Sequence, residues 1–195
     1  MLIGRFFTEV LGVNDMELCQ KLMSMTEVLV VKKGQKIVNF GERPEKVTFL
    51  LKGIFRGYIL NSEGKEITEC FGFQPGDVAV SCCGLDQPSP ICIQALTDCQ
   101  VLCLPVSDCV EIIQTNLEMM AIYSRFLQKA LQTHWEINNA MYQYQALERY
   151  QWFLRNYPNL DEQVNSRYIA SFLSITPVTL SRLRRWLKGQ ADHHE

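Results

Sequence analysis

The run of residues best suited to chemistry lies near the C-terminal end of the sequence, between positions 163 and 190. It contains no acidic residue and five basic ones, Arg167, Arg182, Arg184, Arg185 and Lys188. Residues 1–162 instead hold 14 basic and 19 acidic residues, a balance of −5. A basic segment on an acidic body is what contact with a polyanion requires, because attraction to phosphates drives nucleic-acid binding. Charge alone would also fit a solvated helix face.

The apolar residues of the same run predict two helices joined by a turn. Ser174-Ile175 provides the turn, and small Ala170 lets the helices approach closely. Thr176 is suited to cap the second helix, with Pro177 at its first position, where the missing N–H costs nothing. The residues expected to face each other across the turn are Ile169, Phe172, Leu173, Leu180, Leu183 and Leu187.

This spacing is typical of a helix-turn-helix, whose second helix enters the major groove of DNA with its N-terminal residues at base edges. We expect Arg182 to bind a guanine, and Thr176 or Ser166 to bind a phosphate. The expected DNA-binding residues are Ser166, Arg167, Thr176, Val178, Thr179, Ser181, Arg182, Arg185 and Lys188. A helical hairpin used only for packing would show the same apolar spacing. It would differ by burying Arg182 and Arg185 or pairing them with acids.

Other kinds of chemistry find less support in the residues. The sequence has no Ser–His–Asp order, phosphate loop or paired carboxylates of an active site, so we predict that the protein is not an enzyme. None of its eight cysteines forms a Cys-x-x-Cys pair, and histidines occur only at 134, 193 and 194, so no metal site is predicted. Most cysteines have apolar, strand-like surroundings, which predicts reduced structural thiols. The adjacent pair Cys82-Cys83 leaves a redox role open.

The elements that position the basic run begin with short strands. After helical spacing up to Met25, residues 27–105 show apolar runs with a period near two, separated by glycines and prolines. Strands this short and regular predict an antiparallel barrel, sandwich or roll. A helix then begins near Val106, with Ser107 or Asp108 as its cap.

A long helix is predicted next. No proline or glycine occurs between Asn116 and Tyr157, and apolar residues recur there at three- and four-residue steps. One helix of about 27 residues would be about 40 Å long. Its faces should meet the β-domain and another subunit, with Leu127, Leu131, Trp135 and Asn138 at the subunit seam, although periodicity alone also fits intramolecular packing.

Beyond the long helix, a further helix should span 145–157 and end before Pro158. Residues 159–165 are expected to form a polar linker. The composition, with 47% hydrophobic residues, allows a packed core. No apolar run approaches the ~20 residues of a membrane span, and the first 13 residues lack the order of a signal peptide. We therefore expect a soluble, cytoplasmic protein that does not bind membranes.

Taken together, the elements resemble the Crp/Fnr superfamily of bacterial transcription regulators. The resemblance covers the run VVKKGQKIVNFGERPEKVTFLLKGIFRGYIL, then QALTDCQVLCLP, the long helix, ALERYQWFLRNYP and the predicted helix-turn-helix. It implies an α+β fold with an N-terminal antiparallel β-roll sensor over 1–115, a dimerisation helix over 116–144 and a DNA-binding domain over 145–195. It also implies a homodimer that binds double-stranded DNA in response to a ligand in the roll, with RNA polymerase as a further partner.

Two departures from the family pattern affect the expected ligands. The positions that grip a cyclic nucleotide in the family hold Val80-Ser81 and Ser89-Pro90 here, and no arginine lies between Arg56 and Arg125. A buried phosphate would then lack its guanidinium partner, so we expect no response to cyclic AMP, and we predict no cofactor. The identity of any effector stays open. A remaining pocket would suit a less charged ligand near Phe71, Phe73, Val80, Ser81 and Ser89.

The second departure lies in the recognition helix, which has Pro177 and Val178 where the cyclic-AMP receptor has Arg and Glu. Its base preference should therefore differ. The alternative hypothesis is a ligand-binding or protein-interaction module whose helix-turn-helix no longer binds DNA.

Overall fold

The computed structural model describes residues 3–79, 84–85 and 87–191, and the chain divides into two compact units. Unit 1 comprises Met1–Ile59 and Cys70–Leu131, and unit 2 comprises Leu60–Glu69 and Gln132–Glu195. This division describes packing; the functional division into 1–115, 116–144 and 145–195 stays a prediction.

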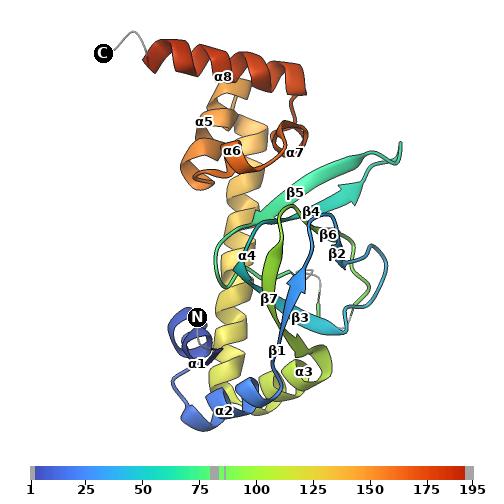
Figure 1. Cartoon of the computed structure of the whole chain (residues 1–195), viewed down its shortest axis with the longest axis vertical. Coiled ribbons are helices and arrows are strands. Elements are labelled where there is room, and N and C mark those ends of the chain that lie inside the picture. Colours follow the sequence, from blue (N-terminus) through green and yellow to red (C-terminus); the bar gives the residue numbers. More distant parts are fainter. Residues whose placement is uncertain (1–2, 80–83, 86, 192–195) are drawn as a thin grey trace. The chain divides into compact units, whose positions relative to one another are not determined.

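Short strands form two sheets in the described part of the chain (Figure 1). One has the order β1-β7-β3 and the other β2-β6-β4-β5. The pairs β1–β7, β3–β7, β2–β6 and β4–β6 are antiparallel. The predicted α+β class with antiparallel sheets is therefore confirmed, and each strand lies in one of the period-two runs of the sequence. The strands are β1 (Glu27–Val31), β2 (Lys36–Val38), β3 (Lys46–Lys52), β4 (Phe55–Leu60), β5 (Glu66–Gly72), β6 (Cys92–Ala95) and β7 (Cys99–Pro105).

Helices precede and follow the strands of unit 1. They are α1 (Ile3–Arg5), the π-helical η1 (Phe6–Val10), α2 (Met16–Ser24), α3 (Val106–Thr115) and the first part of α4 (Leu117–Gln143). Asp15 caps α2, because its side chain accepts hydrogen bonds from the N–H groups of Glu17 and Leu18. The expected cap of α3 by Ser107 or Asp108 is wrong. The helix begins directly after β7, and the N–H of Val106 donates to the carbonyl of Glu45 at 2.9 Å.

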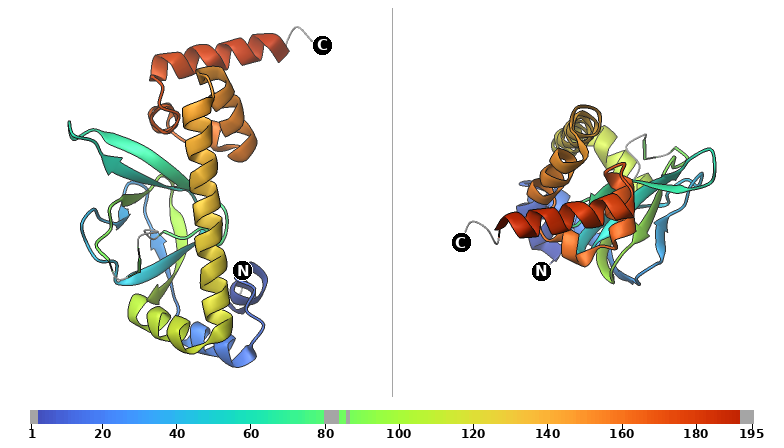
Figure 2. Two further views of the ribbon diagram at one scale, coloured as in Figure 1. Left: turned by 180° about the vertical axis from the view of Figure 1, so that it is seen from behind. Right: turned by 90° about the horizontal axis from the view of Figure 1, so that it is seen from above.

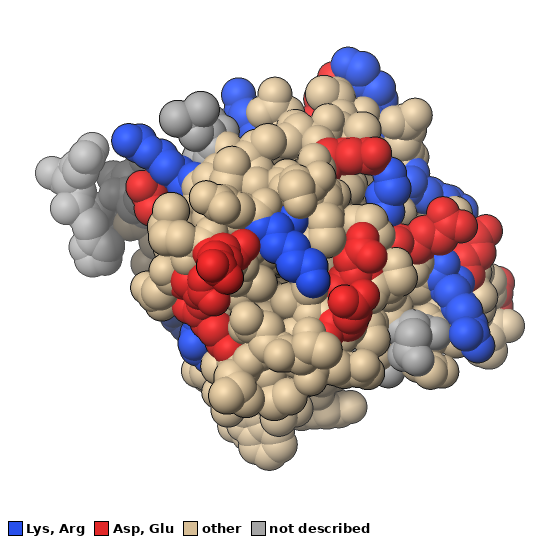
Figure 3. Space-filling model, turned by 90° about the horizontal axis from the view of Figure 1, so that it is seen from below, with Lys and Arg blue, Asp and Glu red and all other residues tan. Residues whose placement is uncertain are grey.

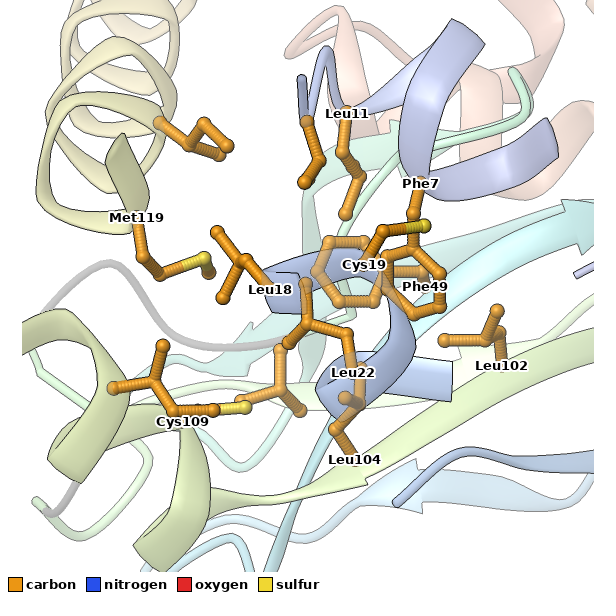
Figure 4. Packing of buried hydrophobic residues seen from close by; sticks show 14 of the residues in the cluster. Phe7, Leu11, Leu18, Cys19, Leu22, Phe49, Leu102, Leu104, Cys109 and Met119 are labelled. Carbon is orange, nitrogen blue, oxygen red and sulfur yellow. The ribbon is translucent and has the colours of Figure 1, made fainter. Parts of the chain in front are cut away.

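Strand β7 separates two hydrophobic cores because successive side chains point to opposite faces of a sheet. Leu102 and Leu104 pack with residues of the helices, among them Phe7, Leu22 and Met119 (Figure 4). The alternate residues face the interior of the roll, between the two sheets, and pack there with Leu50, Phe55 and Ile93; they are Cys99, Val101 and Cys103. One strand thereby holds the helices on one side and closes the roll on the other.

The cysteines of the described residues are free thiols. Cys19, Cys92, Cys99, Cys103 and Cys109 are buried and Cys70 is partly buried. Burial raises the pKa of the Cys109 thiol to about 11, so it stays protonated at neutral pH. The pair Cys82-Cys83 lies outside the described residues.

Unit 2 contains the C-terminal part of α4, which Figure 2 shows as one continuous helix, followed by four further helices. The bounds are α5 (Ala146–Asn156), α6 (Leu160–Gln163), α7 (Ser166–Phe172) and α8 (Pro177–Ala191). Helix α4 has 27 residues, as its periodicity predicts. The expected polar linker at 159–165 is wrong, because it contains α6. Leu160 and Val164 are buried there and anchor the segment in the core.

None of the described helices is long and apolar enough to cross a membrane.

Candidate nucleic-acid interface

Helices α7 and α8 are joined by a turn closed by backbone hydrogen bonds, and we call this segment the α7–α8 pair. The N–H of Ile175 donates to the carbonyl of Ala170 at 2.9 Å, and that of Ser174 donates to Ser171 at 3.1 Å. This pair of bonds is the Schellman pattern, which places one residue in the left-handed region. That residue is Ser174, with φ of 54°. A serine pays a conformational cost there that a glycine would avoid.

The start of α8 is fixed by the cap that the sequence predicts. The hydroxyl oxygen of Thr176 accepts a hydrogen bond from the N–H of Thr179 at 3.1 Å, and the two threonine hydroxyl groups are 2.9 Å apart. Pro177 occupies the first helical position. The Thr176 hydroxyl group therefore uses part of its hydrogen-bonding capacity within α8, although the residue is exposed to solvent.

An aromatic cluster beneath the α7–α8 pair holds α7 in place. The Phe172 ring centroid lies 5.3 Å from that of Tyr157 and 5.9 Å from that of Phe153, and Trp152 stacks on it at 6.2 Å. Leu173 and Leu180 are fully buried, and Leu183 and Leu187 are partly buried. The apolar face predicted for both helices is therefore present.

Further polar contacts within unit 2 fix the C-terminal end of α7. The guanidinium of Arg149 donates to the carbonyl of Leu173 at 2.9 Å and also to that of Tyr144 at 2.9 Å. The hydroxyl group of Ser171 accepts from the N–H of Thr68 at 3.0 Å, in the 60–69 segment of the same unit. Helix α7 is thus tied to its surroundings by side chains that sequence periodicity does not identify.

The basic residue that the sequence groups with the others, Arg184, points inward and pairs with Asp161. Its guanidinium donates to the Asp161 carboxylate at 2.7 Å and to the Asp161 backbone carbonyl at 3.0 Å. It also donates to the hydroxyl group of Ser166. Both charged side chains are mostly buried. The pair joins α8 to α6 and to the start of α7.

Tyr150 also belongs to this network, because its hydroxyl group donates a hydrogen bond to the Oδ2 atom of the Asp161 carboxylate at 2.9 Å. Burial and the hydrogen bond to Asp161 raise the pKa of Tyr150 to about 12, so the hydroxyl group stays a donor at neutral pH. Helical phase could have identified Arg184, since it lies one turn after buried Leu180.

The other predicted residues of α8 lie on its solvent side. Val178 is 61% exposed, Thr179 is partly buried, and four polar and basic residues are exposed, namely Ser181, Arg182, Arg185 and Lys188. Among the described residues, no acid forms an ion pair with Arg182, Arg185 or Lys188. By contrast, acidic and basic side chains lie side by side at the α2 and α3 end of unit 1 (Figure 3), where Lys21 and Glu111 are 3.8 Å apart.

Two further predicted DNA-binding residues begin α7. Ser166 is partly buried, and its hydroxyl oxygen accepts the hydrogen bond from Arg184 described above. Arg167 is exposed, lies over the ring of Tyr168 at 4.5 Å and donates to the Tyr168 hydroxyl group. This stacking holds the Arg167 guanidinium at the surface.

The residues predicted at the subunit seam lie on an exposed stripe of α4. Leu131 is 71% exposed and Trp135 is 66% exposed, and Leu127 is also exposed, while Asn138 is partly buried. The stripe continues at intervals of three or seven residues to other exposed apolar residues, Leu117 and Met120 at one end and Tyr142 at the other. An exposed apolar row of this length is unusual on a single helix that has no partner.

Inside unit 1, the residues predicted to line a ligand pocket have mixed positions. Phe71 and Ser89 are buried, and Phe73 is partly buried. Val80 and Ser81 lie outside the described residues. The Ser89 hydroxyl group donates a hydrogen bond to the carbonyl of Ile91 at 2.7 Å. Its proton is therefore already used in a local contact.

Arg56, which the resemblance included, is fully buried in sheet β2-β6-β4-β5. Its guanidinium donates to the side-chain oxygen of Gln94 at 3.0 and 3.3 Å and lies 4.3 Å from the centroid of the Tyr58 ring. Gln94 in turn donates to the carbonyl of Gly34. The buried guanidinium therefore has a polar and an aromatic partner within the sheet.

Several solved structures share this fold. FixK2 from Bradyrhizobium japonicum aligns with a TM-score of 0.74 and 21% identity, over 85% of this chain and 86% of that one. The c-di-GMP-responsive global regulator CLP from Xanthomonas campestris aligns with a TM-score of 0.71 and 11% identity, over 91% and 93%. A protein from Eubacterium rectale described as a transcriptional regulator of the Crp/Fnr family aligns with a TM-score of 0.71 and 20% identity, over 95% and 88%.

At these identities the structural likeness establishes the fold. No curated protein matches the sequence. Residues 28–116 match the family model of the cyclic nucleotide-binding domain. Residues 28–116 are therefore similar to a cyclic nucleotide-binding domain, and the chain has the fold of Crp/Fnr-type proteins, in agreement with the resemblance seen in the sequence.

Proposed function

We propose that the protein is a DNA-binding transcription regulator of the Crp/Fnr type. It acts as a homodimer joined along α4 and does not respond to cyclic AMP. The main support for this proposal is the exposed row of Arg182, Arg185 and Lys188 on α8. None of these three residues forms an ion pair with an acid among the described residues. Such a row is available to phosphates and base edges.

The alternative is a module whose α7–α8 pair only packs against its own protein. Such a pair would bury or neutralise its cations. Arg184 behaves in that way, since it is mostly buried and paired with Asp161. Arg182 and Arg185 are exposed instead, and this difference within one helix favours DNA binding over the alternative.

The three outward cations should have different roles. Arg182 lies one turn after Val178, near the start of α8, where a recognition helix meets base edges. Its guanidinium can donate two hydrogen bonds to one guanine. Arg185 and Lys188 lie farther along the helix, where it rises toward the phosphate backbone. Thr176, Arg167 and Ser166 are proposed to contribute phosphate contacts at the edge.

The exposed stripe of α4 supports the proposed dimer. Its apolar residues recur at intervals of three, four or seven residues, as in a coiled-coil seam, and a two-fold partner would cover them. Two-fold symmetry would also place two α8 helices to bind inverted half-sites.

The direct experiment is selection of binding sites from random double-stranded DNA at controlled salt. We expect inverted half-sites whose centres lie roughly 34–36 Å apart, or a multiple of that distance. Selected sequences without an inverted repeat would contradict the dimeric DNA-binding proposal.

Arg182→Ala should relax the preference at one base position in each half-site, because a bidentate contact provides about 1–3 kcal/mol of discrimination. Lys188→Ala should weaken binding to all sequences alike and reduce the log–log salt slope by about 0.9, because it removes a phosphate contact. Fluorescence anisotropy with the selected site and single-base variants measures both effects. An unchanged base preference in Arg182→Ala would disprove its proposed role.

Arg184→Gln should destabilise the protein by about 1.5–3 kcal/mol, because Asp161 loses its charged hydrogen bonds while staying mostly buried. The matched changes Arg182→Gln and Arg185→Gln should alter stability by less than about 0.5 kcal/mol, since both side chains are exposed. Urea denaturation followed by circular dichroism compares the three variants. Equal losses would mean that Arg182 and Arg185 are structural.

Leu131→Asp should separate the dimer while leaving the fold intact, because Leu131 is exposed within one chain. The lost apolar burial is about 1.5–3 kcal/mol per subunit. Thr133→Asp is the control, since it adds the same charge at an exposed position on the other side of α4. Sedimentation at tens of micromolar tests the seam. A wild-type monomer, or equal effects of the two changes, would count against it.

Cyclic AMP should give no measurable binding in calorimetry at micromolar protein concentrations. The Ser89 hydroxyl group is used within its own turn, and Ser89-Pro90 stands where the family has its phosphate-binding arginine. A micromolar dissociation constant would refute this part of the proposal.

A further inference from the structure

Helix α8 also carries an exposed aromatic residue, Trp186, which is not among the residues predicted to bind DNA. Trp186 is 49% exposed, whereas α5 and α7 pack against the buried Leu180 side of the helix (Figure 1). Within the part of the chain that the structure describes, its indole N–H donates no hydrogen bond and its ring contacts no other aromatic ring. Trp152 of the same unit is only 9% exposed, and its ring centroid lies 5.8 Å from that of Tyr157. Trp186 is therefore a large apolar group that unit 2 leaves half uncovered.

The position of Trp186 around α8 follows from the 3.6-residue repeat of the helix. It lies four residues after Arg182 and therefore about 40° farther round the helix axis. Lys188 lies three residues after Arg185 and therefore about 60° round the axis in the opposite sense. Arg182 and Arg185 thus form the centre of the outward face, with Trp186 along one flank and Lys188 along the other. Both flanking residues are exposed.

The flanks of a recognition helix have a defined place in a complex with DNA. An α-helix with its side chains is about 10–12 Å in diameter, and the major groove is about 12 Å wide. When the centre of the outward face points to the base edges, the two flanks face the sugar–phosphate walls of the groove. Trp186 also lies in the C-terminal half of α8, which spans Pro177–Ala191, where the helix rises toward the backbone.

We propose that Trp186 packs its ring against a deoxyribose of the DNA backbone, on the wall of the groove opposite the one that Lys188 contacts. This contact rests on the proposed DNA binding. Charge favours DNA as the occupant, because the exposed residues beside the ring include Arg182 and Arg185, and residues 163–190 contain no acid. The sugar is the apolar part of the backbone and is the same in every nucleotide. The contact therefore adds affinity without reading the sequence.

Fluorescence anisotropy with a selected duplex and an unrelated duplex of the same length tests the contact. Trp186→Ala should weaken binding to both roughly three- to tenfold, because covering the exposed half of the ring contributes about half of what full burial would. The log–log salt slope should stay unchanged, because no charge is lost, whereas Lys188→Ala lowers it. Trp186→Phe keeps a ring and should recover most of the affinity. Phe40→Ala removes a ring that is 58% exposed in unit 1, and as the matched control it should bind as the wild type does.

A second measurement observes the ring directly, because the chain has only three tryptophans. Trp135→Phe keeps an aromatic ring at the proposed seam and leaves buried Trp152 and exposed Trp186 as the remaining tryptophans. The selected duplex should then reduce quenching of the tryptophan fluorescence by acrylamide. In Trp186→Phe the same duplex should leave the quenching unchanged. Circular dichroism checks the fold of Trp186→Ala, and if that variant is unfolded, the quenching decides whether the contact forms.

The results distinguish this contact from the proposed function. A wild-type protein that binds neither duplex would contradict DNA binding itself, and the Trp186 contact with it. Wild-type binding together with unchanged affinity in folded Trp186→Ala, or unchanged quenching in Trp135→Phe, would overturn the contact alone. A loss of affinity confined to one base position would also overturn it, because the ring would then contact a base and not the sugar.

Discussion

The rotation of α8 about its own axis decides which of its side chains can reach another molecule, and the Arg184–Asp161 ion pair fixes that rotation. The guanidinium contacts both the carboxylate and the backbone of Asp161, and it also reaches Ser166 at the start of α7. Leu180 is buried one turn earlier on the same face. With these two anchors, Arg182 and Arg185 must lie on the solvent side. The proposed DNA interface therefore depends on a basic residue that does not belong to it.

Regular periodicity made most of the architecture predictable. The 27 residues of α4, the strand runs, the cap at Thr176 and the apolar faces of α7 and α8 all follow from local spacing, because each depends on neighbours in the sequence. The misses depend on distant partners instead. Residues 159–165 look polar, yet Leu160 and Val164 find an apolar core there. Helical phase places Arg184 on the same side of α8 as buried Leu180, but spacing does not identify its partner Asp161, which lies 23 residues earlier.

The same distinction applies to the candidate sites. Outward positions on α8 could be assigned from helical phase, since phase is local. An open cleft of about 680 Å³ on the roll could not be predicted, because its lining comes from β1, β2, β3 and β7, which are far apart in the sequence. Leu29 illustrates the difficulty. In the strand pattern it resembles a core residue, yet it is 41% exposed beside its buried pairing partner Val101.

The two interfaces proposed for this protein differ in chemistry: the dimer seam on α4 is mainly apolar, and the DNA-binding face of α8 is basic. The stripe on α4 is dominated by exposed apolar residues such as Leu131 and Trp135, whereas the outward face of α8 bears Arg182, Arg185 and Lys188. Attraction to phosphates weakens steeply as the salt concentration rises, because releasing counterions into a more concentrated solution gains less free energy. Apolar burial is insensitive to this screening. The proposed dimerisation and the proposed DNA binding should therefore respond differently to ionic strength. On this proposal, a dimer could exchange between DNA sites without dissociating into subunits.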